Sequence, residues 1–368
     1  MRPALNIAIS GGGIAGFTAA LALAQHSHRV TVFERATALT DIGAGIQLSP
    51  NAGKVLSVLG LENAVTAISF EPDILQLVNG KTGQTLSTLP FKSLMQQSYH
   101  GAYLVAHRGD LQAVLMATVN QQPNISIQTG IDIRAFEQGL GNVTVAGQKF
   151  DLLIAADGIN SSLRAHIDPA ARNKASVQTA WRATLPIEIA EARQNAVSVY
   201  MNAGAHLVAY KMGQRPELNV VFVSESQTPP SAANFGGLAK QLLSAAQNWK
   251  AWPLASVHSA VWHKGSALMI GDAAHAMTPH AAQGGAMAIE DALVLANCIA
   301  TASTVEAALR DFQDKRVPRI EAVRALSAQN RAVYQMGGLM AAGRNLTMPV
   351  VPPALLLRRL DWLYGWQA

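Results

Sequence analysis

A glycine-rich segment near the N-terminus, residues 6–35, constrains the fold more than any other part of the chain. It reads NIAISGGGIAGFTAALALAQHSHRVTVFER. Residues 7–9 form a short apolar run typical of a strand buried on both faces, and a helical pattern follows the glycines. Residues 30–33 predict a second strand, which ends at Glu34. A strand, a glycine turn, a helix, a strand and an acid in this order are typical of a dinucleotide-binding unit.

The glycines have the spacing G-x-G-x-x-G, supplied by Gly11, Gly13 and Gly16. One glycine permits the tight turn, one lets the backbone approach a pyrophosphate, and one lets the helix pack closely on the sheet. Ile14 and Ala15 lie at the helix start, where unpaired N–H groups and the positive end of the helix dipole favour phosphate. We therefore expect these five residues to contact a nucleotide cofactor.

Glu34 lies 18 residues after Gly16. This is about the distance at which a carboxylate binds the ribose hydroxyls of a dinucleotide. We expect Glu34 to have this role and the adjacent Arg35 to contact the same cofactor.

An N-terminal signal peptide is the alternative explanation for these residues. No residue from Leu5 to Gln25 is charged, Arg2 precedes the run, and residues 22–24 (ALA) resemble a signal-peptidase site. Three consecutive glycines interrupt the apolar run, however, and a strand with Glu34 at its end follows. These features favour the nucleotide-binding unit.

The composition limits the class of protein. The 368 residues are 49% hydrophobic and 14% charged, which predicts a globular core and argues against disorder. The net charge of +5 is spread along the chain without a basic run, which disfavours a nucleic-acid partner. Cys298 is the only cysteine, so no disulfide forms within the chain. We expect no transmembrane helix and a cytoplasmic location.

Two further apolar strands end in short polar motifs. Residues 150–155 (FDLLIA) lead into Asp157-Gly158, and residues 267–270 (ALMI) lead into Gly271-Asp272. Between them, residues 177–223 alternate in the manner of β-strands. We therefore predict an α/β fold in which a Rossmann-like nucleotide-binding domain (1–170 and 265–330) is interrupted by a β-rich substrate domain (171–264). Residues 70–100 are expected to contribute to the substrate domain, and 331–368 to form a C-terminal helical segment.

Local patterns give more detailed expectations. Asp110 is placed to cap a helix that begins near His107, and residues 238–249 look helical. Glu290 and Asp291 are expected to flank the buried stripe of a helix after the Gly284-Gly285 turn. The C-terminal part from Thr304 is predicted to be helical, with a break at Pro318.

Together, these motifs resemble those of the class A flavoprotein monooxygenases, which are FAD-dependent aromatic hydroxylases. DLLIAADGINSSLR is similar to the family's Asp-Gly motif, ALMIGDAAHAMTPHAAQGGAMAIEDALVLA to its Gly-Asp motif, and HRGDLQAVL to a segment whose arginine contacts FAD. The resemblance covers residues 6 to 325 and the last few residues. It implies that FAD is bound by Arg108, Asp157, Asp272, Pro279, Gly284 and Gly285.

The salicylate-hydroxylase-like branch fits best, on GAGIQLSPNA (43–52), the pair Trp181-Arg182 and the ending LDWLYG (360–365). The resemblance implies that NAD(P)H reduces FAD, that O2 forms a flavin C4a-hydroperoxide, and that one oxygen passes to a small aromatic or heteroaromatic substrate. Backbone N–H groups between Pro279 and Gly285 are expected to stabilise negative charge on the reduced flavin.

Substrate contacts are predicted from the segment HLVAYKM. His206, Val208 and Tyr210 share one face of a strand at period two, and a strand of this kind faces the substrate in the family. His206 and Tyr210 are therefore candidate catalytic residues in contact with a phenol or carboxylate. The alternative, in which one is a core residue and the other is exposed, is equally open. Gln47 and His280 are also placed to approach the flavin.

The chain departs from the family pattern at three positions. Ala286 and Met287 replace polar residues common after the glycine turn, and Ala282 stands where glycine is frequent, so the polarity around the flavin is in doubt. His275 and His280 have poor spacing for a shared metal ion and have no third ligand, so we predict no metal site.

Other functions stay open at this point. One is an oxygenase of the same fold for a larger polycyclic substrate, and another is a non-catalytic nucleotide-binding or redox-sensing protein. A flavin halogenase is disfavoured because no Trp-x-Trp-x-Ile-Pro stretch is present. A homodimer is compatible with the sequence.

Overall fold

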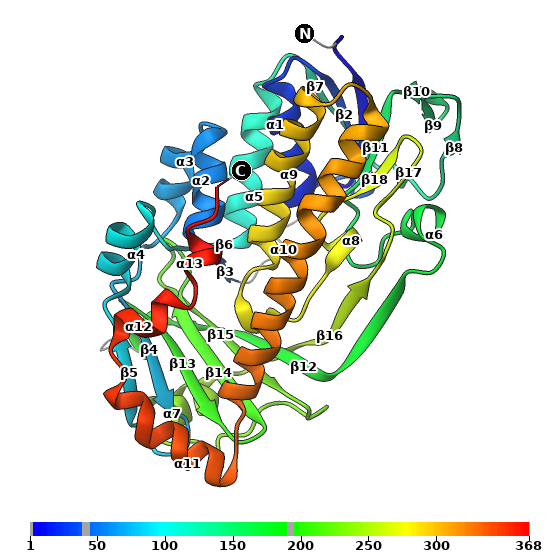
Figure 1. Ribbon diagram of the computed structural model, residues 1–368. Helices are drawn as coiled ribbons and strands as arrows, with labels where there is room; N and C mark the ends of the chain where they lie inside the picture. The colour runs from blue at the N-terminus through cyan, green and yellow to red at the C-terminus, as the bar shows by residue number, and fades with distance from the viewer. Residues whose placement is uncertain (1–2, 39–44, 190–194, 368) are drawn as a thin grey trace.

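The computed structural model describes residues 3–38, 45–189 and 195–367. Its upper half is built on a six-stranded sheet in the order β17-β18-β11-β1-β2-β7 (Figure 1). The strands are β1 (Asn6–Ser10), β2 (Arg29–Glu34), β7 (Ile125–Thr129), β11 (Leu152–Ala155), β17 (His263–Lys264) and β18 (Ala267–Met269). All neighbours pair in parallel except β17 with β18. Short uniformly apolar strands such as β11 suit this sheet because helices and loops bury both of its faces.

Long helices pack together on this sheet. They are α1 (Ile14–Ala24), α5 (Arg108–Asn120), α9 (Gly284–Thr301) and α10 (Val305–Tyr334). In Figure 1 they lie side by side in front of the strands, with α9 between α1 and α10. A small sheet of β8 (Glu137–Gln138), β9 (Val143–Val145) and β10 (Gln148–Phe150) lies near the edge.

A seven-stranded sheet forms the lower half, in the order β16-β12-β15-β14-β13-β4-β5. The central strands are β12 (Arg172–Pro186), β13 (Ala196–Asn202), β14 (Ala205–Lys211) and β15 (Glu217–Ser224), with β16 (Lys250–His258) at one edge. The hairpin β4 (Ile74–Asn79) and β5 (Thr85–Leu89) completes the other edge through parallel pairing of β4 with β13. Leu242 and Leu243 of α7 (Gly237–Ala245) pack against its far face.

The remaining elements connect the two sheets. The ribbon β3 (Gly45–Leu48) and β6 (Leu104–His107) pairs antiparallel, and the helices α2 (Pro50–Val58), α3 (Glu62–Ile68) and α4 (Phe91–Tyr99) lie beside it. Gly43 and Ala44, which begin the GAGIQLSPNA motif, lie outside the described residues. Short helical turns α6 (Arg164–Ile167), α8 (Asp272–His275) and η2 (Pro279–Ala281) follow the motif-bearing strands.

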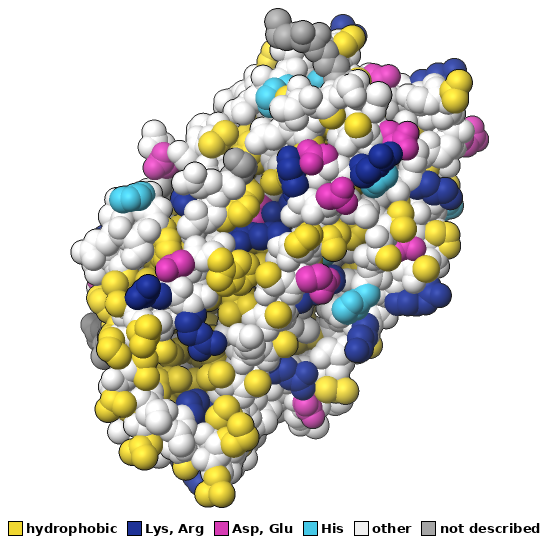
Figure 2. Space-filling view, in the orientation of Figure 1, with side chains coloured by type: hydrophobic (Ala, Val, Ile, Leu, Met, Phe, Trp, Pro, Cys, Tyr) yellow, Lys and Arg dark blue, Asp and Glu magenta, His cyan; other side chains and the backbone are white. Residues whose placement is uncertain are grey.

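The C-terminal helices lie on the surface. They are α11 (Gly338–Thr347), the turn η3 (Met348–Val350), α12 (Pro353–Arg358) and α13 (Asp361–Tyr364). α11 buries none of its residues, whereas Leu363 and Tyr364 of α13 reach the core. Figure 2 shows hydrophobic side chains gathered over this lower face, whereas charges of both signs intermix above it. The C-terminal helices therefore join the main core mainly through Leu357 of α12 and Leu363 and Tyr364 of α13.

Four local predictions were wrong. Helix α10 runs through Pro318 without a break. The lost hydrogen bond costs up to about 3 kcal/mol, and burial of Phe312, Ile320 and Val323 on both sides of the proline offsets it. The helix expected over 238–249 ends at Ala245, and a short connection with a left-handed Asn248 (φ +57°) leads into β16.

The other two errors concern acidic residues. His107, not Asp110, is the N-cap of α5, and Asp110 instead accepts two hydrogen bonds from Arg215, at 2.6 and 3.1 Å. Glu290 and Asp291 do not flank the buried stripe of α9 but are fully buried. Short-range patterns missed both because each carboxylate has a basic partner far away in the sequence.

Within the described ranges, α9 is the one helix long and apolar enough to cross a membrane by length and composition. It packs instead between α1 and α10, and 72% of its apolar window is buried inside the protein. Its hydrophobicity is therefore that of a core helix.

The glycine turn after β1 is held by close backbone contacts. Gly11 has φ +108°, and a Cβ on it would lie 2.5 Å from the carbonyl oxygen of Ala156. A Cβ on Gly16 would lie 1.9 Å from the carbonyl oxygen of Gly11. Both positions require glycine, since only glycine lets the start of α1 approach β1 and β11 this closely.

We predict that Gly16→Ala lowers the free energy of unfolding by about 1–3 kcal/mol or more, because the methyl group would displace backbone rather than a flexible side chain. Gly343→Ala, on the exposed side of α11, has open space for its methyl group and is expected to be neutral or to stabilise by about 1 kcal/mol. Thermal and denaturant unfolding of the two variants without FAD would test this. Equal stabilities would contradict the packing role of Gly16.

Candidate active site

A cavity of about 500 Å³ lies between the two large sheets. Its walls come from the loops after β1, β2 and β11, from β3, from β14 and β15, and from the turn that leads into α9. This size is within the usual range for ligand sites. One end of the cavity is formed by the loops at the edge of the six-stranded sheet, and the other end by the face of the seven-stranded sheet. A single ligand can therefore extend from those loops to β14 and β15.

Parallel pairing brings the three sequence motifs to one end of this cavity. Ser10 at the end of β1 pairs with Ala155 of β11, which pairs in turn with Met269 of β18. The glycine turn, Asp157-Gly158 and Gly271-Asp272 therefore emerge at neighbouring points. Of the predicted cofactor residues, the following line the cavity: Gly11, Gly13, Ile14, Ala15, Glu34, Arg35, Arg108, Asp157, Asp272, Pro279, Gly284 and Gly285.

Gly16 is the predicted cofactor residue that does not line the cavity. It faces the backbone of Gly11, so its part is to permit close packing of α1. Gly13 is different, because a Cβ at this N-cap position of α1 would meet nothing within 4 Å. The space in front of Gly13 is open, as a phosphate-binding turn requires.

Glu34 holds the glycine turn and also faces the cavity. Its carboxylate accepts hydrogen bonds from the backbone N–H of Gly12 at 2.7 Å and of Ala36 at 2.9 Å. Gln112 of α5 donates to the carbonyl oxygen of Gly12 at 2.9 Å. The acid at the end of β2 is therefore fixed beside the turn, where it can also accept hydrogen bonds from ribose hydroxyls.

Asp157 carries an unsatisfied oxygen. Its Oδ2 accepts a hydrogen bond from the N–H of Ser162 at 2.9 Å, whereas Oδ1 is buried without a partner among the described residues. Burial raises the pKa of this carboxyl, although hydrogen bonds from Ser161, Ser162 and Leu163 oppose the shift. Asp157 lines the cavity, and a carboxylate oxygen without a protein partner there could bind a ligand donor.

Arg164 ties the Asp-Gly loop to the Gly-Asp loop, and the sequence did not single it out for this. Its Nε donates to the carbonyl oxygen of Ala273 at 2.8 Å, and its terminal nitrogen donates to those of Gly158 and Ile159 at 3.2 and 2.6 Å. Asp272 itself is exposed at the mouth of the cavity.

The turn before α9 faces the cavity with backbone groups. Ala282 has φ +53°, a left-handed conformation that explains why glycine is frequent at this position and that costs an alanine about 1–2 kcal/mol. Gly284 begins α9, so the first N–H groups of the helix have no partner within it. Ala286 and Met287 are buried and do not line the cavity, so these two departures from the family pattern do not alter its polarity.

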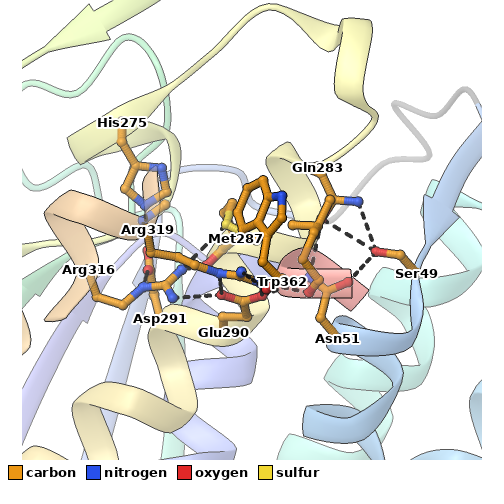
Figure 3. A network of polar contacts seen from close by, with 12 residues as sticks. Ser49, Asn51, His275, Gln283, Met287, Glu290, Asp291, Arg316, Arg319 and Trp362 are labelled. Atoms are coloured by element: carbon orange, nitrogen blue, oxygen red, sulfur yellow. Dashed lines mark hydrogen bonds and ion pairs between the residues drawn. The ribbon is translucent and has the colours of Figure 1, made fainter. Parts of the chain in front are cut away.

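A buried polar network fixes the same turn from behind (Figure 3). Gln283 donates to the hydroxyl of Ser49 at 3.0 Å and accepts from Asn51 at 3.2 Å. Asn51 also donates to Glu290 at 2.7 Å. Helix α2, which follows β3, and the start of α9 are therefore joined through side chains that are almost fully buried.

Arg316 of α10 closes the network with two charge pairs. It donates to Glu290 at 2.6 Å and to Asp291 at 2.7 Å. Asp291 further accepts from His275 at 2.6 Å and from the N–H of Gly271 at 2.8 Å. Burial alone would raise the pKa of the Asp291 carboxyl, but His275 and Arg316 outweigh it and lower the pKa to about 2.

His275 is thus a partner of Asp291. Within the described parts of the chain, no group of three or more His, Cys, Asp or Glu side chains is arranged to hold a metal ion.

The opposite wall of the cavity is β14, on which His206, Val208 and Tyr210 all face inward. The ring of Tyr210 packs against Gly45, where a Cβ would lie 2.6 Å from it. Burial raises the pKa of Tyr210 to about 12, and Arg182, Gln47 and Asn219 oppose the shift. The phenol of Tyr210 is therefore protonated and available as a donor.

His206 is held by a chain of amides. Its Nδ1 lies 3.0 Å from the amide nitrogen of Gln335, whose carbonyl oxygen accepts from Gln178 at 2.6 Å. Its ring stacks with that of His280, with centroids 5.3 Å apart. Burial, with a smaller contribution from His280, lowers the pKa of His206 to about 3, and burial lowers that of His280 to about 4. Both rings are therefore neutral at pH 7.

Gln47 and Arg182 also line this part of the cavity. Gln47 was predicted to approach it, whereas Arg182 was noted only as part of a family motif. No local pattern identifies Arg182, because its position is set by strand pairing within a sheet assembled from distant segments.

Comparison with known proteins agrees with this geometry. A family model for an FAD binding domain matches residues 4–206 and 237–327. The chain is 30% identical to 3-hydroxybenzoate 6-hydroxylase 1 of Aquipseudomonas alcaligenes, over 98% of this chain and 97% of that protein. It is 28% identical to 6-hydroxynicotinate 3-monooxygenase of Bordetella bronchiseptica, over 88% of this chain and 91% of that one.

A solved salicylate hydroxylase substrate complex has the same fold, with a TM-score of 0.82 and 21% identity, covering 100% of this chain and 97% of that chain. The protein is thus a flavoprotein with an FAD-binding domain. It belongs to the class A FAD-dependent aromatic monooxygenases, as its motifs predicted.

The cavity residues fit FAD. The open space at Gly13 and the N-terminus of α1 suit the pyrophosphate, Glu34 suits the ribose, and the unpaired Oδ1 of Asp157 suits a hydroxyl donor. Asp272 and the turn before α9 line the same cavity as His206 and Tyr210, so a flavin ring held by the turn could approach the β14 wall.

We predict that Gly13→Val weakens FAD binding by about 10-fold or more, equivalent to about 1.4 kcal/mol, because the side chain would enter the open space of the turn. The FAD-free protein should lose only about 0.5–2 kcal/mol of stability, since valine is a poorer N-cap than glycine but no protein atom lies within 4 Å of the new Cβ. Flavin fluorescence titration and thermal unfolding would measure the two effects. Unchanged FAD affinity would contradict the placement of the pyrophosphate.

We also predict a pH effect on stability from His280. Its lowered pKa means that the unfolded chain binds a proton below pH 6.5 while the native ring stays neutral down to about pH 4. The free energy of unfolding therefore decreases as the pH is lowered through this window, by about 2 kcal/mol per such histidine between pH 7 and pH 5. His280→Gln should remove this share of the fall.

Urea unfolding of wild type and His280→Gln at pH 5, 6 and 7 would test the effect. His26→Gln, a change to an exposed histidine, is the matched control and should follow wild type. Parallel curves for wild type and His280→Gln would show that His280 is not held neutral in the native state.

Proposed function

We propose that the protein hydroxylates a small aromatic or heteroaromatic ring that carries a hydroxyl group, and that this ring binds between β14 and the turn before α9. One observation carries the proposal: His206 and Tyr210 line the same cavity as the nucleotide turn. The names of the two relatives, which act on 3-hydroxybenzoate and 6-hydroxynicotinate, support this substrate class. Bound FAD supplies the oxygen chemistry, with NAD(P)H as reductant.

In this proposal His206 binds the substrate hydroxyl. An amide nitrogen only donates, so Nδ1 of His206 accepts from Gln335 and the neutral ring carries its proton on Nε2. Nε2 has no partner among the described residues, so it can donate to an oxygen in the cavity. Tyr210, which also keeps its proton, is a second donor from the same face. Two neutral donors stabilise an electron-rich phenolate-type ring without adding charge.

The remaining cavity residues would hold the cofactor. Glu34 would bind the ribose, Gly13 and the start of α1 the pyrophosphate, and Asp272 the ribityl chain, with Arg108 close by. The first N–H groups of α9 would face the flavin ring edge that gains negative charge. The side chains of the cavity walls exclude water, which protects reactive flavin chemistry.

We further propose that the protein works in the cytoplasm. NAD(P)H is a reductant of the cell interior, and the single cysteine, Cys298, is buried and unpaired. A chain without disulfides is typical of a reducing compartment.

The test is an assay of the purified protein loaded with FAD. We predict that 3-hydroxybenzoate, salicylate or 6-hydroxynicotinate stimulates NADH or NADPH oxidation, with O2 consumed and a hydroxylated product detected by mass spectrometry. His206→Ala should lower kcat by about 100-fold or more if the donor positions the reacting ring. FAD should stay bound in this variant.

Two outcomes would favour the alternatives. Stimulation only by polycyclic compounds would indicate an oxygenase for larger substrates. Bound FAD with no stimulation by any aromatic compound would indicate a non-catalytic or redox-sensing protein.

A further inference from the structure

Arg182 occupies a distinctive place in the cavity wall. It lies on β12, where it pairs with Val221 of β15, and Val221 pairs in turn with Val208 of β14. Residues paired directly across neighbouring strands share a face of the sheet. Arg182, Val221 and Val208 therefore form one row across the face that lines the cavity, and all three are among its lining residues.

The guanidinium of Arg182 has no acidic partner. Among the described residues it makes no hydrogen bond or ion pair, and its Nε is buried without an acceptor. It lies over the ring of Trp252, whose centroid is 5.7 Å from Cζ. Burial lowers its pKa, opposed by Tyr210, while Arg108 adds to the lowering.

The two arginines that are buried among the described residues both have hydrogen-bond acceptors. Arg316 contacts two carboxylates, and Arg164 donates to backbone carbonyl oxygens and to Asn173. Arg182 is half-buried, and a cation with a buried nitrogen that lacks an acceptor is costly. A fold retains such a group most readily where a ligand supplies the negative charge. Planar guanidinium groups bind carboxylates through two parallel hydrogen bonds.

We propose that Arg182 binds the carboxylate of an aromatic acid substrate and so sets the specificity of the enzyme for acids. This rests on the proposed function, and it narrows the substrate class from hydroxylated aromatics to hydroxylated aromatic acids. Strands β12 and β14 are two strand spacings apart, about 10 Å. A ring lying over Val221 and Val208 would therefore have its hydroxyl near His206 and Tyr210 and its carboxylate toward Arg182.

A phosphate of NAD(P)H is the other anion that could approach Arg182. Its binding would change the KM for the nicotinamide cofactor rather than the affinity for substrate. The two cases are separable because substrate binding to oxidised FAD-loaded protein can be measured with no NAD(P)H present.

The experiment compares matched acid and neutral probes. The flavin absorbance of wild-type, Arg182→Gln and Arg182→Lys protein is titrated with 3-hydroxybenzoate and 3-hydroxybenzyl alcohol, and with 6-hydroxynicotinate and 6-hydroxynicotinamide. We expect Arg182→Gln to raise the Kd of the acids by about 10- to 100-fold, the usual effect of losing a charge-assisted pair. The neutral probes should change by less than about threefold. Arg182→Lys should recover part of the affinity.

Lys250→Gln is the matched control. Lys250 lies directly opposite Arg182 on the neighbouring strand β16, but it is exposed and does not line the cavity. It should behave as wild type. Equal FAD content and unfolding temperature in all variants would show that they are folded.

Three results would overturn the proposal. The first is that Arg182→Gln weakens binding of the acids and of the neutral probes equally. The second is that Lys250→Gln weakens binding of the acids as much as Arg182→Gln does. The third is that Arg182→Gln raises the KM for NADH while its Kd for the acids is unchanged. Wild type that binds only the neutral probes would also overturn it. If neutral aromatics then still stimulate NADH oxidation, the result supports the proposed hydroxylase function and contradicts only the role of Arg182.

Discussion

Parallel pairing of β1 with β11 and of β11 with β18 is the constraint on which the rest of the structure depends. The carboxyl ends of parallel strands meet at one edge of a sheet, so three loops separated by more than 100 residues become neighbours. The pairing is tight enough that Gly11 and Gly16 have no room for a side chain. The nucleotide end of the cavity is therefore a direct consequence of backbone hydrogen bonding.

Buried charge supports the turn before α9 from the side that faces away from the cavity. Glu290 and Asp291 project from α9 into the protein, where Arg316 and Arg319 of α10 neutralise them (Figure 3). Removing one partner from such a cluster would leave an uncompensated buried charge, at a cost of about 3–5 kcal/mol. Arg319 also donates to the carbonyl oxygens of Trp362 and Leu363, so the C-terminal α13 is joined to the same network. The start of α9 is thus fixed from α2, α10 and α13 together.

The part of the cavity lined by β12 and β14 combines neutral donors with Arg182, which has no ion pair among the described residues. Burial disfavours charge on both His206 and Tyr210, so the imidazole of His206 stays neutral and the phenol of Tyr210 keeps its proton. Arg182 keeps its charge and has no hydrogen-bond acceptor among the described residues, whereas the buried Arg164 and Arg316 both have acceptors. This arrangement suits a ligand that brings a hydroxyl and a negative group to opposite edges of one ring.

Motifs that depend on local backbone geometry could be predicted from the sequence. The G-x-G-x-x-G turn, Asp157-Gly158 and Gly271-Asp272 each require a strand end and a turn, which short-range patterns encode. Predictions that depended on distant partners were less accurate. Pro318 does not break α10, because packing on both sides holds the helix, and Asp110 does not cap α5, because Arg215 pairs with it.

The sequence by itself therefore determined the nucleotide-binding unit, the α/β class and the family, since each rests on residues close together in the chain. Only the tertiary structure decided that Glu290 and Asp291 are buried partners of Arg316. It also decided that His206, Tyr210 and Arg182 share a single cavity wall. The physical reason is that burial and pairing across a sheet depend on which distant strands become neighbours. The spacing of residues along one strand does not contain that information.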